Sequence, residues 1–317
     1  MGRKRVIVAM SGGVDSSTAA ALLVRQGYEV SGVTMRLWTP ENPDALVDLR
    51  RCCSPQEIED ARTVCRALGV PHRVLNFERE FTSSVVDYFC QEYLRGHTPN
   101  PCLACNQHIK FRLLLPKALA QGADYLATGH YCRIVRNDHG HELWRARDEG
   151  KDQSYVLFAI ARELLGRILF PLGDMPNKQN VRERARAMGL AVHDKPDSQE
   201  ICFVADDYVD FLRQRAPQAL RPGRIVNAAG EVLGKHDGYA RFTIGQRKSL
   251  GIATGAPMYV LAIHPATRTV VVGTKEQLLR DRLTVCGINW IAFDAAPDSL
   301  EADVKVRYRQ PEQPAAI

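Results

Sequence analysis

The first half of the chain alternates between two patterns of hydrophobic and polar residues. Short runs rich in β-branched residues, each the length of a buried strand, occupy residues 5–10, 29–37, 72–77 and 124–128. Segments with apolar residues every three or four positions lie between and after them, at 16–26, 54–68, 80–94 and 109–120. These segments are predicted to be helices. Strands that alternate with helices of this length predict a doubly wound α/β fold built on a parallel sheet.

The pattern changes near residue 220. Apolar and polar residues now alternate in short runs with turn residues between them, at 224–227, 259–263 and 269–272. This alternation is typical of short strands, so small β domains are expected after the parallel sheet. The stretch from 152 to 215 is predicted to be largely helical. We therefore predict three domains, which span residues 1–205, 206–275 and 276–317.

Composition narrows the class of protein. With 317 residues, of which 45% are hydrophobic, the chain can fill ordinary cores. The N-terminal segment lacks the features of a signal peptide and no apolar run is long enough to cross a bilayer, so a cytoplasmic location is expected. The formal net charge of +6 weakly favours a polyanionic partner. Nine cysteines without the spacing of a disulfide framework point to thiols that are buried, metal-bound or catalytic.

The strongest chemical signal is Ser11-Gly12-Gly13-Val14-Asp15-Ser16-Ser17, which follows the first predicted strand and opens the first helix. Glycines let the backbone approach a phosphate closely, and the free N–H groups of a helix N-terminus point at it. Asp15 would repel phosphate unless Mg²⁺ bridges the two groups. The segment lacks the Gly-Lys-Ser/Thr of enzymes that split the β–γ bond, and it lacks the dinucleotide pattern G-x-G-x-x-G.

This heptapeptide resembles the signature of the PP-loop ATP pyrophosphatases, whose fold is of the adenine nucleotide alpha hydrolase type. Enzymes of that class split ATP between the α- and β-phosphates and adenylate a carbonyl oxygen. The alternative is a Ser/Gly-rich turn that only caps a helix. The ordered strand, glycine pair, aspartate and two serines disfavour that alternative.

Three cysteines lie in informative contexts. Cys102 and Cys105 follow Asn100-Pro101, and Cys202 lies far along the chain in Ile201-Cys202-Phe203. Two thiols suit sulfur delivery, because one carries a persulfide and the other resolves it as a disulfide. The same three cysteines are also a candidate ligand set for an iron–sulfur cluster with one open iron, or for zinc with a fourth ligand. The residues alone leave both interpretations open.

Several separate motifs resemble, in one order along nearly the whole chain, the bacterial tRNA-specific 2-thiouridylases. The motifs span residues 9–16, 96–101, 127–131, 151–155, 201–203, 243–247 and 307–309. The resemblance implies that the first domain is catalytic and that its helical part faces tRNA. It also implies that the two later domains are a small central β domain and a C-terminal β-barrel-like domain.

The family pattern assigns roles to individual residues of this chain. It implies an ATP site made of Ala9, Met10, Ser11, Gly12, Gly13, Val14, Asp15, Ser16, Met35 and Gly129. It implies contacts with the target base at Asn100, Pro101 and Cys102, and with tRNA at Lys151, Asp152, Gln153, Arg307 and Tyr308. Cys105 matches the family's nucleophile and Cys202 the cysteine that carries the persulfide, and the two would form a transient disulfide. Position 102 departs from the pattern, because many members have Asp there.

The resemblance further implies a reaction and its partners. ATP, with Mg²⁺, would adenylate O2 of the wobble uridine in the tRNAs for Lys, Glu and Gln. A cysteine desulfurase or a sulfur-carrier protein would supply the sulfur. Thiolation at another tRNA position and a non-catalytic nucleotide- or RNA-binding module are the alternatives. Relatives continue with more strands beyond the C-terminal motif, so we expect an incomplete barrel with open strand edges, weakened tRNA affinity and intact ATP binding.

Overall fold

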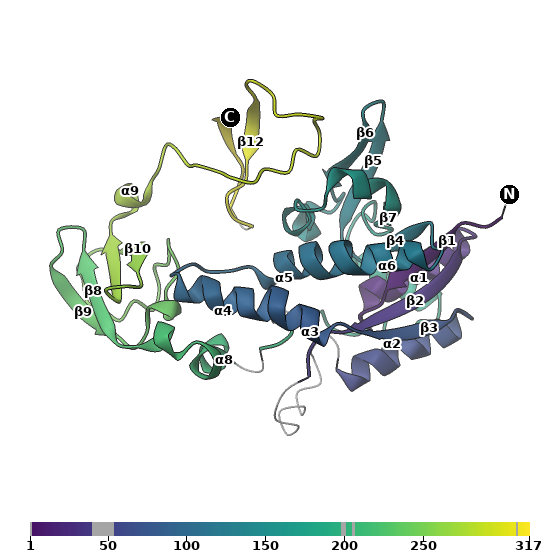
Figure 1. Ribbon diagram of the computed structural model, residues 1–317, viewed down its shortest axis with the longest axis horizontal. Coiled ribbons are helices and arrows are strands. Elements are labelled where there is room, and N and C mark those ends of the chain that lie inside the picture. The colour runs from purple at the N-terminus through teal and green to yellow at the C-terminus, as the bar shows by residue number, and fades with distance from the viewer. Residues whose placement is uncertain (1, 40–53, 198–200, 205–206, 309) are drawn as a thin grey trace.

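The computed structural model describes residues 2–39, 54–197, 201–204, 207–308 and 310–317. Its largest sheet has five parallel strands in the order β3-β2-β1-β4-β7 (Figure 1). The strands are β1 (Arg5–Ala9), β2 (Glu29–Arg36), β3 (His72–Asn76), β4 (Tyr125–Ala127) and β7 (Ile168–Leu169). The chain adds strands on one side of β1 and then crosses to the other side. The carboxyl ends of β1 and β4 therefore flank the switch point where α/β sheets bind ligands.

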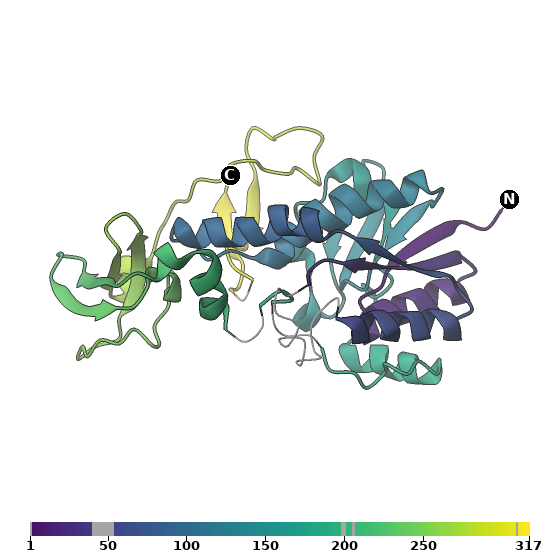
Figure 2. The same cartoon turned by 60° about the horizontal axis from the view of Figure 1, so that its bottom comes forward.

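The alternating side chains of β1 create the two faces of this sheet. Val6 and Val8 belong to the core shared with helices α1 (Val14–Arg25), α2 (Pro55–Ala67) and α7 (Lys178–Ala187). Ile7 and Ala9 belong to the opposite core, beneath the helices that lie between residues 78 and 120. Figure 2 shows helices on both faces of the sheet. The predicted doubly wound fold is confirmed.

Two long helices cover the second face, and each contains a π-helical segment. The first consists of α3 (Glu78–Phe81), a π-helical turn (Thr82–Val86) and α4 (Asp87–Leu94). The second consists of α5 (Pro101–Ala104), a π-helical segment (Cys105–Leu114) and α6 (Leu115–Ala120). No helix in the described part of the chain has both the length and the apolar character needed to cross a membrane.

The second helix begins earlier than its apolar periodicity predicts. Asn100 caps it, because its side-chain oxygen accepts hydrogen bonds from the backbone N–H groups of Cys102 (3.1 Å) and Leu103 (3.3 Å). Pro101 occupies the first turn, where its missing N–H is harmless. The predicted start near residue 109 was therefore wrong, and Cys105 is a helical residue.

The stretch predicted as largely helical is only partly so. It contains α7, α8 (Tyr208–Arg215) and short 3₁₀ turns at Ser154–Val156 and Arg162–Arg167, and a further 3₁₀ turn, Glu149–Lys151, lies directly before it. Strand β7 also falls within it. Just before it, β5 (Cys132–Asn137) and β6 (Gly140–Arg145) form an antiparallel hairpin that the sequence analysis missed.

Small β units follow, as predicted. Strands β8 (Gly223–Asn227), β9 (Val232–His236), β10 (Tyr259–His264) and β11 (Thr269–Gly273) form one sheet in the order β10-β11-β8-β9. A short 3₁₀ turn precedes β8 at Pro217–Leu220, another lies at Tyr239–Arg241, and helix α9 spans Lys275–Leu278. Strands β12 (Glu301–Val304) and β13 (Gln313–Ala316) pair as a separate ribbon, so the described residues contain no closed barrel there.

Candidate functional site

The loop between β1 and α1 is held by contacts that only glycine allows. Gly12 has a positive φ of 72°, and a Cβ there would lie 2.2 Å from the backbone oxygen of Glu57. A Cβ on Gly129, just beyond β4, would lie 2.6 Å from the backbone nitrogen of Ser16. The side chain of Ser16 in turn accepts a hydrogen bond from the backbone N–H of Ser11 (3.1 Å). The loop is therefore wedged between the ends of α2 and β4.

A cavity of about 640 Å³ opens in front of this loop. Its lining joins segments that are distant in the sequence, among them the loop, the stretch around Lys151–Gln153 and the C-terminal residues Lys305 and Tyr308. Helix α7 and the following segment contribute Lys178, Lys195 and Asp197. A space of this size and polarity suits a nucleotide-sized ligand.

Asp15 is the electrostatic centre of the cavity. Lys178 donates to both of its carboxylate oxygens at 2.7 Å, and the Tyr131 hydroxyl donates to Oδ1 at 2.7 Å. Burial, together with the neighbouring Asp15 carboxylate, raises the pKa of Tyr131 far above its usual range. Tyr131 therefore stays a neutral donor.

Asp197 extends the same ion network. Lys178 lies 2.8 Å from its Oδ1, and Lys151 lies 3.2 Å from its Oδ2. Burial would raise the pKa of Asp197, but the two ammonium groups outweigh that effect and hold the pKa below its usual range. Arg182, a residue of α7, also reaches Asp197 Oδ1 at 3.2 Å. The cavity thus concentrates positive charge around two carboxylates.

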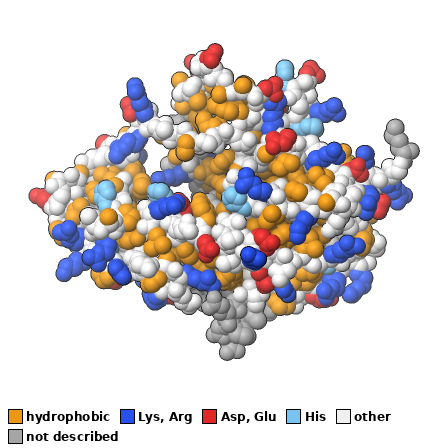
Figure 3. Space-filling view, viewed as in Figure 1, with side chains coloured by type: hydrophobic (Ala, Val, Ile, Leu, Met, Phe, Trp, Pro, Cys, Tyr) orange, Lys and Arg blue, Asp and Glu red, His pale blue; other side chains and the backbone are white. Residues whose placement is uncertain are grey.

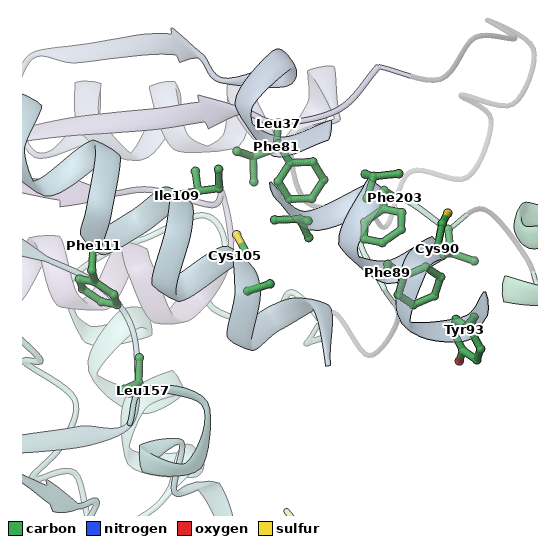
Figure 4. Close-up of a cluster of buried hydrophobic side chains, with 14 of the residues drawn as sticks. Leu37, Phe81, Phe89, Cys90, Tyr93, Cys105, Ile109, Phe111, Leu157 and Phe203 are labelled. Atoms are coloured by element: carbon green, nitrogen blue, oxygen red, sulfur yellow. The ribbon is translucent and has the colours of Figure 1, made fainter. Parts of the chain in front are cut away.

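The cysteines lie in and against one hydrophobic core. Cys102 is exposed in the first turn of its helix, whereas Cys105 is buried one turn before Ile109 (Figure 4). Burial raises the pKa of Cys105 to about 11, and the Lys110 ammonium partly opposes that rise. Cys202 is half-buried and packs against the same core.

Phe203 anchors the segment that carries Cys202. Its ring lies 5.2 Å from that of Phe89, 5.3 Å from Phe211 and 5.7 Å from Phe81, all in edge-on geometry. Figure 4 shows this ring among the side chains of the helix that precedes the Cys105 helix. The aromatic cluster therefore keeps the chain next to Cys202 against the core that also contains Cys105.

The arrangement gives no support to a metal site. Among the residues described by the structure, no three His, Cys, Asp or Glu side chains are grouped so as to hold a metal ion. Cys102 is exposed and Cys105 is buried, so their side chains do not share one environment. Cys52 and Cys53 lie outside the described residues.

Comparison with known proteins places the chain in a family. Residues 4–206 match a family model described as tRNA methyl transferase HUP domain, and residues 209–274 match one described as tRNA methyl transferase PRC-barrel domain. The chain is 50% identical to the tRNA-specific 2-thiouridylase MnmA of Carboxydothermus hydrogenoformans, over 100% of this chain and 87% of that protein. The chain belongs to the MnmA family.

Two further similarities are to a second MnmA protein and to a solved structure. The MnmA protein of Geobacter metallireducens is 49% identical over 99% of this chain and 86% of its own length. A solved 4-thiouridine synthetase–RNA complex with bound ATP aligns with a TM-score of 0.41 and 18% identity, over 68% of this chain and 51% of that chain.

The residues that the MnmA pattern assigns to ATP converge on the cavity or directly behind it. Ser11, Gly13, Val14 and Asp15 line the cavity. Gly12, Ser16 and Gly129 shape the loop from behind. Ala9, Met10 and Met35 are buried at or just beyond the carboxyl ends of their strands.

The residues that the pattern assigns to tRNA and its target base lie in three places. Lys151, Asp152 and Gln153 meet Tyr308 at the cavity, where the Tyr308 hydroxyl donates to the backbone oxygen of Asp152 at 3.2 Å. Arg307 is not among the lining residues; a Cβ on Gly245 would lie 2.8 Å from its guanidinium. Asn100, Pro101 and Cys102 form the start of the Cys105 helix.

Sequence reasoning missed several lining residues of the site, among them Tyr131, Lys178, Lys195 and Asp197. Lys195 donates to the backbone oxygen of Gly12 at 3.1 Å and to Asp60 at 2.6 Å, so it ties the loop to α2. Lys178 is the first residue of α7, where the helix dipole opposes a cation. A lysine in the first turn of a predicted helix is unfavourable unless an anion lies nearby, so the sequence did offer this signal of a neighbouring carboxylate or phosphate.

Proposed function

We propose that this chain is a tRNA-specific 2-thiouridylase, a tRNA-uridine 2-sulfurtransferase that replaces O2 of the wobble uridine with sulfur at the expense of ATP. One observation carries the proposal: the cavity in front of the PP-loop also takes in Lys151–Gln153 and Tyr308. ATP and the tRNA would therefore meet at this cavity. The identity of 50% to a 2-thiouridylase over the whole chain supports the same reaction.

The first step would be adenylation. The free N–H groups at the start of α1 would hold the ATP phosphates, and Lys178, Lys151 and Lys195 would balance their charge. Uridine O2 attacks the α-phosphorus, the bond to the bridging oxygen breaks, and pyrophosphate leaves. Mg²⁺ that arrives with ATP would find a carboxylate ligand in Asp15, and it would neutralise phosphate charge.

The second step would transfer sulfur. The terminal sulfur of a persulfide on Cys202 attacks C2, and AMP leaves with the former O2. The Cys105 thiolate then attacks the Sγ atom of Cys202, which forms a Cys105–Cys202 disulfide and leaves the second sulfur on C2. A dithiol reductant must afterwards supply two electrons to restore both thiols. A cysteine desulfurase or a sulfur-carrier protein would then reload Cys202.

The tRNA would bind across the basic surface beyond the cavity. Lys and Arg side chains gather over the end of the molecule that carries β8 and β9 (Figure 3). The exposed cations there include Arg221, Arg224, Lys235, Arg247 and Lys248. Phosphate contacts of this kind give affinity without base specificity. We propose that residues 1–205 hold the chemistry, that 206–275 and 276–317 help to hold the tRNA, and that the tRNAs for Lys, Glu and Gln are the substrates.

The test is sulfur incorporation by the full chain. The protein is loaded with persulfide, incubated with ATP, Mg²⁺ and unmodified tRNA, and the digested tRNA is analysed for 2-thiouridine by mass spectrometry. Cys105→Ser and Cys202→Ser are expected to abolish the product and to retain pyrophosphate release. Cys286→Ser, which changes an exposed cysteine, is the matched control and should keep full activity.

Other outcomes would redirect the assignment. Thiolated nucleosides that map to another position would mean a different target base. Pyrophosphate release without any thiolated nucleoside would reduce the chain to a nucleotide-activating protein. Product formation by Cys202→Ser at the wild-type rate would contradict the role of this cysteine.

A further inference from the structure

The segment of residues 94–98 leads from the end of α4 to the helix that carries Cys105. It is docked on the β8–β11 unit, which matches the second family model over residues 209–274. At the start of the segment, the Tyr239 hydroxyl donates to the backbone oxygen of Leu94 at 3.1 Å. At its end, the hydroxyls of Thr98 and Thr243 are hydrogen-bonded to each other at 2.8 Å. Both ends of the segment are therefore held by side chains of the β8–β11 unit.

The middle of the segment is packed as closely as its ends. Gly96 is buried, and a Cβ added to it would lie 3.0 Å from Cγ of Pro265 and 3.1 Å from Cγ2 of Ile263, at the end of β10. Only a residue without a side chain lets the backbone approach β10 this closely. Figures 1 and 2 both show this end of α4 beside the β8–β11 unit.

The segment passes directly into the residues that the MnmA pattern assigns to the target base, Asn100, Pro101 and Cys102. Asn100 accepts from the backbone N–H groups of Cys102 and Leu103 and so defines where the helix begins. Cys105 follows in the same helix. A displacement of residues 94–98 would therefore move the helix start and its cysteines relative to the PP-loop cavity.

The turn that contains Thr243 also contacts the C-terminal segment. A Cβ on Gly245 would lie 2.8 Å from the guanidinium of Arg307. The residue before Arg307 is tied to the α/β unit, because the Tyr155 hydroxyl donates to the backbone oxygen of Val306 at 3.0 Å. One turn of the β8–β11 unit thus lies between the segment that leads to the target-base residues and a residue that the pattern assigns to tRNA.

We propose that Thr243 is a positioning residue, which through Thr98 fixes the target-base residues in the place where the wobble uridine meets ATP. The β8–β11 unit then takes part in the reaction itself and does not only hold the tRNA. Small displacements of reacting groups slow a reaction strongly, so a hydrogen bond that sets the helix start affects the rate. This proposal rests on the proposed function for its purpose, but the contact between the two threonines involves only residues of this chain.

The test is a kinetic comparison of Thr243→Val, which keeps the shape of the side chain without its hydroxyl, with Thr243→Ser, which keeps the hydroxyl. The full chain is loaded with persulfide, and 2-thiouridine formation is measured at saturating ATP over a range of tRNA concentrations. Thr243→Val is expected to lower kcat about fivefold, the effect of losing one hydrogen bond, and to leave KM for tRNA within about twofold of wild type. Thr243→Ser should retain the wild-type kcat.

Thr254→Val is the matched control, because the Thr254 hydroxyl also lies exposed on the β8–β11 unit and donates to the backbone oxygen of Ala256 at 2.8 Å, away from residues 94–98. It should change neither constant. A raised KM with an unchanged kcat would restrict the unit to tRNA binding and overturn the proposal, as would no change at all. Thr98→Val should match Thr243→Val, and the double variant should be no slower than either, because all three lose the same hydrogen bond.

A second measurement needs no substrate. Hydrogen–deuterium exchange, followed by mass spectrometry, reports on the backbone N–H groups of Cys102 and Leu103 that Asn100 caps. Thr243→Val is expected to speed their exchange about threefold and to leave exchange in α1 unchanged, since the loss loosens only the segment it anchors. Equal exchange in Thr243→Val and wild type would overturn the proposal. A wild-type protein that makes no 2-thiouridine would instead contradict the proposed function, so the two can fail independently.

Discussion

The ammonium of Lys178 lies 2.7 Å from both carboxylate oxygens of Asp15, although the two residues are 163 positions apart in the chain. The same ammonium lies 2.8 Å from Asp197. Lys178 therefore links the loop after β1 to the segment that leads to Cys202. When ATP phosphates enter the cavity, they compete with these carboxylates for the same cation. Under the proposed function, the ion network would therefore couple nucleotide binding to the segment that leads to Cys202.

Replacing Lys178 with Met is expected to weaken ATP binding about tenfold or more, which corresponds to about 1.4 kcal/mol. The change removes a cation from a largely enclosed position, where its attraction to phosphate is little screened. Isothermal titration calorimetry with ATP and Mg²⁺ measures the effect. Lys117→Met, an exposed lysine outside the cavity, should bind as the wild type does. Equal affinity in the two variants would show that Lys178 only braces Asp15.

Replacing Tyr131 with Phe removes the hydroxyl that donates to Asp15. A hydrogen bond to a charged group contributes about 1.5–3 kcal/mol, so the free energy of unfolding should fall by about that amount, and ATP affinity should fall as well. Tyr239→Phe is the matched control, because its buried hydroxyl donates to the backbone oxygen of Leu94 at 3.1 Å, outside the cavity. It should lower stability by about 1 kcal/mol and leave ATP binding unchanged. Urea unfolding measures the loss of stability in each variant, and isothermal titration calorimetry measures its affinity for ATP.

Replacing Gly129 with Ala forces a methyl group to within 2.6 Å of the Ser16 backbone nitrogen. Backbone atoms cannot move aside cheaply, so the loop must shift, and we expect a loss of about 1–3 kcal/mol in stability together with weaker ATP binding. Gly255→Ala has open space around its added methyl and should stay within about 0.5 kcal/mol of wild type. Thermal unfolding with and without ATP provides both readings. A Gly129→Ala protein that ATP stabilises as strongly as the wild type would contradict the close fit.

Replacing Phe203 with Leu shortens the anchor next to Cys202. The ring contacts with Phe81, Phe89 and Phe211 would be lost, and stability should fall by about 1–2 kcal/mol. Because the PP-loop cavity is lined by other residues, pyrophosphate release should persist and 2-thiouridine formation should decrease several-fold. Phe111→Leu, another buried aromatic of the same core, is the control for a general loss of packing. If both variants reduced thiolation equally, the anchoring role of Phe203 would be excluded.

The buried thiol of Cys65 should make stability depend on alkaline pH. Burial raises its pKa to about 11 in the folded protein, whereas an unfolded thiol ionises near pH 8.5. The folded state therefore holds this proton where the unfolded state has lost it. The stabilising contribution is complete below the unfolded value and is lost as pH rises towards about 11, by at most about 2–3 kcal/mol.

Cys65→Ala removes this linkage, so its free energy of unfolding should fall less steeply than that of the wild type between about pH 8.5 and 11. Urea unfolding across that range measures the difference. Cys286→Ala, at an exposed cysteine, should reproduce the wild-type slope. Parallel curves for wild type and Cys65→Ala would show that the Cys65 thiol ionises equally in the folded and unfolded states.

The predictions from sequence were accurate where a few adjacent residues decide the structure. The apolar run at residues 5–10 predicted a buried strand, and the structure confirms it as β1, whose residues after Arg5 are all buried. The helix predicted at residues 54–68 is confirmed as α2, and Ser54 caps it, since its hydroxyl accepts a hydrogen bond from the backbone N–H of Glu57 at 3.2 Å. The hairpin β5–β6 was missed because its strands are half-exposed and carry charged residues that mask their alternation.

The order of residues along the chain by itself determined the phosphate loop, the parallel sheet behind it and the family. These follow from spacing and backbone chemistry within short segments. Only the tertiary structure decided that Lys178, Lys195 and Asp197 complete the cavity and that Tyr308 closes it from the far end of the chain. Such relationships depend on which elements pack together, and an ion pair across the fold forms only after hydrophobic burial has placed its two helices or loops side by side.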